Sequence, residues 1–182
     1  MQLYLIRHPQ PEIAPGICYG QSDIAVSDAQ CQFVLRQLHN ALPFDMPLFS
    51  SPLQRCATLA NMLHPAPTFD ARLMEMHFGK WEMQPWDAIA RTEIDAWAAD
   101  VAGYAPGGGE TVIGMAVRVI QFLSDLVEKG QSDAAIVAHA GSMRLMLAYQ
   151  LGMQPGDLAE KVVKEKKSIQ FGECIQLPIK LC

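Results

Sequence analysis

The chain begins with an apolar run, residues 3–6, that ends directly in Arg7 and His8. A continuous apolar run of this length is typical of a strand buried on both faces of a parallel sheet. In open α/β sheets, ligands bind in the crevice outside the carboxyl ends of the strands. His8 is therefore a candidate for chemistry and Arg7 a candidate anion binder. For these two residues alone, a strand that exits into solvent is the simpler interpretation.

A second apolar run repeats this arrangement near the other end of the chain. Residues 134–138 are entirely apolar and are followed by His139, after which Ala140 and Gly141 lead into a predicted helix. The amino end of a helix presents free backbone N–H groups that attract anions. This strand end therefore adds a second histidine and a helix start to the predicted crevice.

A third short strand is expected at residues 46–51. Ser51 and Pro52 follow the pattern of an N-cap and first helical position, which would put Arg55 in the first turn of the next helix. Because parallel strands end at one edge of the sheet, the two arginines and two histidines are expected to meet there.

Four such side chains at one edge suit an anion, most simply a phosphoryl group. Fixed donors around its oxygens would also stabilise a phosphoryl-transfer transition state without a metal. The sequence contains no P-loop and no aspartate-rich magnesium motif. We therefore predict no cofactor and no metal.

The alternation of strands and helices predicts an α/β fold. We expect a three-layer α/β/α sandwich whose mostly parallel sheet carries helices on both faces. Residues 1–182 are expected to form a single domain, with a lid-like insertion at about 73–109. Predicted helices occupy residues 27–42, 52–63, 86–99, 110–129 and 140–151, with a charged helix end at 160–167, and further strands are predicted at 68–70 and within 168–180.

Composition narrows the setting. A net charge of −5 argues against nonspecific binding to nucleic acid, and no apolar run reaches membrane-spanning length. The start of the chain lacks the features of a signal peptide. The five cysteines are scattered and show no Cys-x-x-Cys spacing, as expected of free thiols in the cytoplasm. A homodimer is compatible with the sequence, which does not decide the oligomeric state.

The chain resembles the histidine phosphatase superfamily, the phosphoglycerate-mutase-like enzymes. The motifs that carry the resemblance appear in family order along almost the entire chain. They are Arg7-His8, residues 50–55 (SSPLQR), residues 73–75 (LME) with residues 79–82 (GKWE), and residues 137–141 (VAHAG).

The resemblance implies roles for these residues. His8 would be the nucleophile that forms a phosphohistidine, and Arg7, Arg55 and His139 would bind the phosphoryl oxygens. Glu75 would protonate the leaving oxygen and then activate water, although Glu82 lies in the same segment and is the alternative. Ala140, Gln21 and Ser22 are further candidates on the substrate side, and Gln21 and Ser22 could instead support the loop.

Two residues depart from the family pattern. Pro9 follows His8 where the family usually has glycine, which removes one backbone N–H from the rim of the pocket. Ala14 falls about where the family has an asparagine near the phosphate. We interpret both as features of a subgroup with a different loop.

Several segments look like the α-ribazole phosphatase branch of cobalamin biosynthesis. They are residues 7–11 (RHPQP), 16–23 (GICYGQSD), 95–97 (DAW) and 108–111 (GGET). The resemblance implies a cofactor-independent phosphatase acting on a small phosphorylated substrate, with α-ribazole 5′-phosphate as the first candidate. A phosphatase for another phosphometabolite or for a phosphoprotein, and a non-catalytic phosphate-binding module, remain as alternatives. Trp81, Trp86 and Trp97 could form an aromatic wall for a nucleoside-like substrate, but core packing is the preferred prediction.

Overall fold

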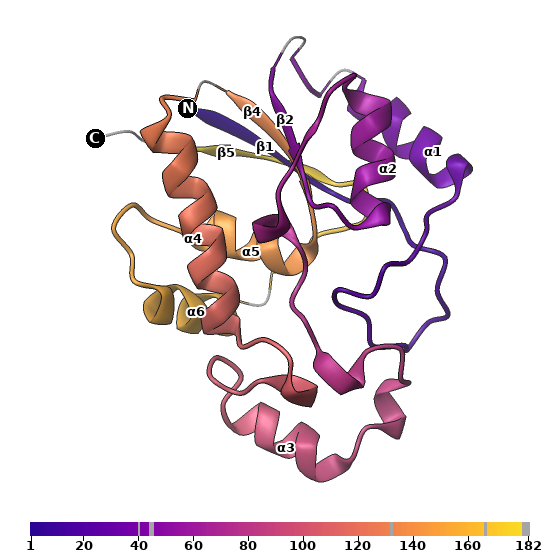
Figure 1. The fold of residues 1–182 in the computed structure, drawn as a ribbon, viewed down its shortest axis with the longest axis vertical. Helices are drawn as coiled ribbons and strands as arrows, with labels where there is room; N and C mark the ends of the chain where they lie inside the picture. The colour runs from indigo at the N-terminus through magenta and orange to yellow at the C-terminus, as the bar shows by residue number, and fades with distance from the viewer. Residues whose placement is uncertain (40, 44–45, 132, 166, 180–182) are drawn as a thin grey trace.

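In the part of the chain that the structure describes, five strands form one sheet that lies between two groups of helices (Figure 1). The computed structural model describes residues 1–39, 41–43, 46–131, 133–165 and 167–179. In these ranges the strand order is β3-β2-β4-β1-β5. Four strands run parallel, and only β5 is antiparallel, paired with β1. The strands are β1 (Gln2–Arg7), β2 (Leu48–Ser50), β3 (Thr68–Phe69), β4 (Ala134–Ala138) and β5 (Cys174–Pro178).

Alternating side chains of the central strands enter two separate cores. Leu3, Leu5 and Ile136 pack on one face, in one cluster with residues of the helices that cover it. Tyr4, Ile6 and Val137 pack on the opposite face in a second cluster. The first face is covered by α4 (Val112–Glu128), α5 (Ala140–Ala148) and α6 (Pro155–Lys164), and the second by α1 (Asp28–Leu38) and α2 (Gln54–Leu63). The predicted three-layer α/β/α sandwich is confirmed.

The helix boundaries follow local chemistry that the sequence shows only in part. Ser27 caps α1 by accepting the N–H of Gln30, as predicted. The predicted Ser51 cap of α2 is wrong, because the N-cap residue is Leu53. The Ser51 hydroxyl instead lies 2.8 Å from Nε2 of His139. The helix expected over 110–129 runs from Val112 to Glu128 behind a Thr111 cap, and the one expected to reach residue 151 ends at Ala148.

The carboxyl-terminal third contains α6 and β5, both in segments for which the sequence predicted a helix end and one or two strands. The charged segment at 160–167 overlaps α6, which already begins at Pro155. Proline at the first helical position was the signal for this start. Within 168–180 a single strand forms, β5, and Lys180 lies outside the described residues.

The segment 73–109 lies beyond the edge at which the parallel strands end, at the bottom of Figure 1. The helix expected over 86–99 is interrupted there. A 3₁₀ turn, Trp86–Ala88, precedes α3 (Arg91–Ala99), and Ile89 and Ala90 between them are extended. The break lets the Ile89 side chain pack with buried Trp81. None of the helices in the described ranges is long and apolar enough to cross a membrane.

Candidate active site

The predicted strand ends meet at one edge of the sheet. Because β1 and β4 are parallel neighbours with Arg7 opposite Ala138, the next residues, His8 and His139, lie side by side. Their ring centroids are 5.0 Å apart. The backbone N–H of His8 donates to the Ala138 carbonyl at 3.0 Å, which extends the ladder past the strand.

His8 is held as a neutral imidazole with one defined tautomer. Its Nδ1 lies 2.7 Å from the carbonyl oxygen of Pro9. A carbonyl can only accept, so Nδ1 carries the hydrogen and Nε2 keeps its lone pair. Burial, together with the positive charges of Arg55 and Arg7, lowers the pKa of His8 to about 3, against the opposing effect of the Pro9 carbonyl. Pro9 therefore orients the histidine through its carbonyl, for which the missing N–H is irrelevant.

Arg7 and Arg55 border the same cavity as His8. Arg7 donates from Nη1 to the Ile169 carbonyl at 2.5 Å. Arg55 is completely buried in the first turn of α2 and donates to the carbonyls of Gly20 and Ser22. In the part of the chain that the structure describes, Nε of each arginine is buried without a partner. Two cationic side chains that border the cavity beside His8 suit the oxygens of a phosphoryl group.

His139 reaches the site from behind His8. It is completely buried and does not border the cavity, and its Nε2 lies 2.8 Å from the Ser51 hydroxyl. Burial, with the nearby His8 and Arg55, lowers its pKa well below the ordinary value. His139 is therefore neutral at pH 7, and it contacts the His8 ring rather than the open pocket.

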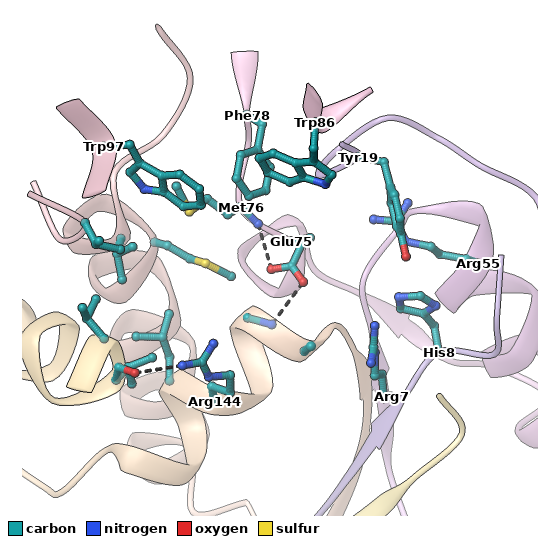
Figure 2. A pocket seen from close by; sticks show the side chains of 18 of the residues that line it. Arg7, His8, Tyr19, Arg55, Glu75, Met76, Phe78, Trp86, Trp97 and Arg144 are labelled. Atoms are coloured by element: carbon teal, nitrogen blue, oxygen red, sulfur yellow. Dashed lines mark hydrogen bonds between the residues drawn. The ribbon is translucent and has the colours of Figure 1, made fainter. Parts of the chain in front are cut away.

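The two candidate carboxylates have different environments. Glu75 faces the cavity, where Oε2 accepts the N–H of Gly141 at 3.1 Å and Oε1 accepts that of Met76 at 3.0 Å (Figure 2). Figure 2 shows its carboxylate between the apolar end of the pocket and His8. Glu82 lies outside the cavity lining and accepts backbone N–H groups of Gln21, Ser22 and Phe78.

These contacts decide which carboxylate is available for proton transfer. Burial raises the pKa of Glu82, but hydrogen bonds from Ser22, Gln21 and Phe78 outweigh it and leave the pKa lowered. A carboxylate that is occupied by so many donors cannot serve as an acid at neutral pH. The geometry therefore favours Glu75 for acid–base chemistry and assigns Glu82 to holding the loop.

The backbone that carries Glu75 is anchored from α4. Arg118 donates to the carbonyls of Arg72, Met74 and Glu75 at 2.7 to 3.0 Å. Its guanidinium is in turn fixed by Glu110, with Nε to Oε1 at 2.7 Å. Both side chains are largely buried, which makes this pair a positioning device for Glu75.

The remaining sequence candidates separate into two groups. Ala140 borders the cavity at the start of α5. Gln21 and Ser22 do not border it, and their polar groups bond to Glu82 and to the Glu75 carbonyl. The structure therefore favours loop support for Gln21 and Ser22, which was the alternative interpretation.

The cavity itself has a volume of about 530 Å³ and extends well beyond the charged groups. Its far part is apolar and aromatic. Figure 2 shows Trp97 and Arg144 at the end away from His8. The apolar and aromatic side chains that line the cavity include Met76, Phe78, Trp86, Trp97, Val101, Val112, Met115, Leu145, Val162 and Val163.

Core packing, the preferred prediction for the tryptophans, holds only for Trp81, which is 1% exposed. Trp86 and Trp97 border the cavity with their rings nearly parallel, 6.0 Å between centroids and 9° between planes. Phe78 meets both edge-on. No periodicity in the sequence separates these rings from core residues. Tyr19, which also borders the cavity, was missed among the site residues although it lies in a quoted motif.

Comparison with known proteins identifies the family to which the chain belongs. The sequence profile of the histidine phosphatase superfamily (branch 1) matches residues 3–169. The chain is 27% identical to the adenosylcobalamin/α-ribazole phosphatase of Salmonella typhimurium, over 87% of this chain and 83% of that one. It is 30% identical to the glucosyl-3-phosphoglycerate phosphatase of Mycolicibacterium vanbaalenii, over 84% and 75%. The crystal structure of the α-ribazole phosphatase from Shigella flexneri superposes with a TM-score of 0.82 at 25% identity, covering 99% of this chain and 91% of that one. The chain belongs to the histidine phosphatase superfamily.

Proposed function

We propose that this protein is a phosphomonoesterase that works through a phosphohistidine on His8, and that its substrate is α-ribazole 5′-phosphate. The observation that carries the proposal is the composition of the cavity. One end holds a neutral histidine, two arginines and a carboxylate, and the other end is apolar and aromatic. A phosphate ester with a planar, largely apolar leaving group matches both ends.

In the first step, Nε2 of His8 attacks phosphorus and the bond to the leaving oxygen breaks. Glu75 donates a proton to that oxygen, so the alcohol leaves neutral. Arg7 and Arg55 stabilise the charge of the equatorial oxygens, because both cationic side chains border the cavity beside His8.

In the second step, the Glu75 carboxylate takes a proton from water as the water attacks the phosphohistidine. The P–N bond breaks, phosphate leaves and neutral His8 is restored. His139, for which the resemblance implies phosphoryl binding, supports the ring of His8 from behind in this proposal. No step requires a cofactor.

The leaving group is assigned from the aromatic end of the cavity. α-Ribazole carries a benzimidazole base, and such a planar ring can stack on Trp86 or Trp97. Relatives bearing the α-ribazole phosphatase name support this choice, and the relative named glucosyl-3-phosphoglycerate phosphatase suggests a polar ester instead. The apolar lining of the cavity favours the α-ribazole ester over a polar ester. A cytoplasmic location belongs to the proposal and is supported by the free thiols of Cys18, Cys31, Cys56 and Cys174.

The decisive experiment compares steady-state turnover of α-ribazole 5′-phosphate with that of a panel of phosphometabolites and phosphopeptides, with and without EDTA. We expect the highest kcat/KM for the ribazole ester, no effect of EDTA, and complete loss in His8→Ala. A phosphoenzyme that is stable in base and labile in acid would support the intermediate. Much faster turnover of another ester would overturn the substrate, and full activity of His8→Ala would overturn the mechanism.

The aromatic end can be tested separately. Trp97→Ala is expected to raise KM for the ribazole ester while leaving KM for a small alkyl phosphate unchanged. If phosphate binds but no ester in the panel turns over, the protein would be a phosphate-binding module rather than an enzyme.

A further inference from the structure

The phosphoryl end of the cavity has fewer donors than its family pattern implies. Pro9 has no N–H to offer, and Ala14 is exposed and lies outside the cavity lining. His139 is turned towards Ser51 behind the nucleophile. Arg7 and Arg55 each donate some of their N–H groups to backbone carbonyls. A transferring phosphoryl group has three equatorial oxygens to satisfy, so another donor at this end would matter.

Tyr19 is the uncharged polar side chain that borders this end of the cavity. In Figure 2 its ring descends from the loop and its hydroxyl points towards His8, with Arg55 alongside. The Arg55 guanidinium carbon lies 5.4 Å from the centre of the Tyr19 ring. The hydroxyl therefore lies among the residues that would surround the phosphoryl group.

The backbone on both sides of Tyr19 is fixed. The N–H of Cys18 donates to the Gln84 carbonyl, and the Cys18 carbonyl accepts the N–H of Met83, each at 2.8 Å. On the other side, Arg55 binds the Gly20 carbonyl. A Cβ on Gly20 would lie 2.0 Å from the Met76 carbonyl oxygen, so the chain approaches as closely as only glycine allows. A side chain anchored in this way is preorganised rather than mobile.

The hydroxyl is also in the right hydrogen-bonding state. Arg7 and Arg55, the charged groups that border the cavity nearby, can only donate, so neither accepts the phenol hydrogen. Burial raises the pKa of Tyr19 although Arg7 and Arg55 oppose it, and the phenol stays protonated at neutral pH. Tyr19 thus offers an O–H that no charge change removes.

We propose that the Tyr19 hydroxyl donates a hydrogen bond to an equatorial oxygen of the phosphoryl group, supplying the contact that Pro9 and Ala14 cannot make. The inference rests on the proposed phosphatase function. It makes Tyr19 a catalytic residue whose contribution is independent of the leaving group, in contrast to the tryptophans at the far end.

The test is Tyr19→Phe, which keeps the ring beside Arg55 and removes only the hydroxyl. Tyr104→Phe is the matched control, because Tyr104 is half-buried beside Trp81 and does not border the cavity. Three quantities are measured for each: kcat/KM with the ribazole ester, kcat/KM with a small alkyl phosphate, and the dissociation constant of inorganic phosphate by calorimetry.

A hydrogen bond to a charged oxygen predicts a loss of about 10- to 100-fold in kcat/KM for both esters in Tyr19→Phe. Phosphate should also bind more weakly, and Tyr104→Phe should match the parent protein. Values within twofold of the parent overturn the proposal, as does a loss confined to the ribazole ester, which would put Tyr19 at the leaving group. If the parent protein hydrolyses no ester, the proposed function fails, and the phosphate affinities alone still decide whether Tyr19 binds the anion.

Discussion

The contact between Glu75 and Gly141 offers a sharp test of the acid–base assignment. Gly141 is the second residue of α5, and its N–H binds Glu75 Oε2. A Cβ at this position would lie 2.1 Å from Glu75 Oε1, whereas ordinary contact begins at 3.4 Å. In Gly141→Ala the carboxylate must therefore move by about 1 Å or more. A displacement of that size at a reacting group lowers rates by roughly 100-fold.

The assay separates this effect from a loss of stability. Alanine is favoured over glycine inside a helix by about 0.5–1 kcal/mol, so Gly141→Ala should fold at least as well as the parent apart from the local clash. Gly156→Ala is the matched control, because Gly156 is the second residue of α6 and a Cβ there meets nothing within 4 Å. We expect kcat to fall about 100-fold in Gly141→Ala and to be unchanged in Gly156→Ala, with similar melting temperatures.

The assay also compares two substrates whose leaving groups differ in their need for a proton. An alkyl alcohol needs a proton as it departs, whereas p-nitrophenolate needs little help. Gly141→Ala should therefore lower the rate of phosphoenzyme formation much more with an alkyl ester than with p-nitrophenyl phosphate. Parent-like kcat for the alkyl ester, with Gly141→Ala folded, would refute the role assigned to Glu75.

Three further outcomes are expected. Phe171→Leu removes the ring whose centre lies 3.8 Å from the Arg7 guanidinium carbon. Loss of this partly exposed cation–π contact should lower kcat/KM by about 2- to 10-fold. The control Phe33→Leu, on the exposed surface of α1, should leave kcat/KM unchanged. Glu82→Gln should reduce melting temperature and kcat/KM together while leaving the pH–rate profile unchanged, because Glu82 holds the loop and transfers no proton; an altered profile would contradict this. The pKa of His8 is about 3 in the folded protein and about 6.5 in the unfolded chain, so the unfolded chain binds a proton at higher pH. The free energy of unfolding should therefore fall as the pH drops from 6.5 towards 3. An identical decline in His8→Ala would exclude His8 as its source.

Much of the architecture follows from local pattern. The apolar runs before His8 and His139 are long enough to be strands and too short to be anything else of that composition, and parallel pairing then requires their ends to meet. The same logic brought Arg55 to this edge, although the cap expected at Ser51 was wrong. A serine can cap a helix or bind another side chain, and the contact between the Ser51 hydroxyl and His139 forms only in the packed structure.

The identity of the working carboxylate was not decided by the sequence. Glu75 and Glu82 are seven positions apart on the same irregular segment, and neither has a periodic signature. Their difference arises from their partners, because loop N–H groups occupy Glu82 and the start of α5 holds Glu75 in the cavity.

By itself, the sequence predicted the α/β/α sandwich, the sheet edge at which the candidate site residues lie and His8 as the candidate nucleophile. The positions where the strands end depend on short apolar runs that are visible in the sequence, whereas the strand order comes from the structure. The tertiary structure alone decided that Trp86 and Trp97 face the cavity while Trp81 is buried, and that Tyr19 points to the phosphoryl end. These orientations come from contacts between residues distant in sequence along loops without a period, and no local rule specifies which way such side chains turn.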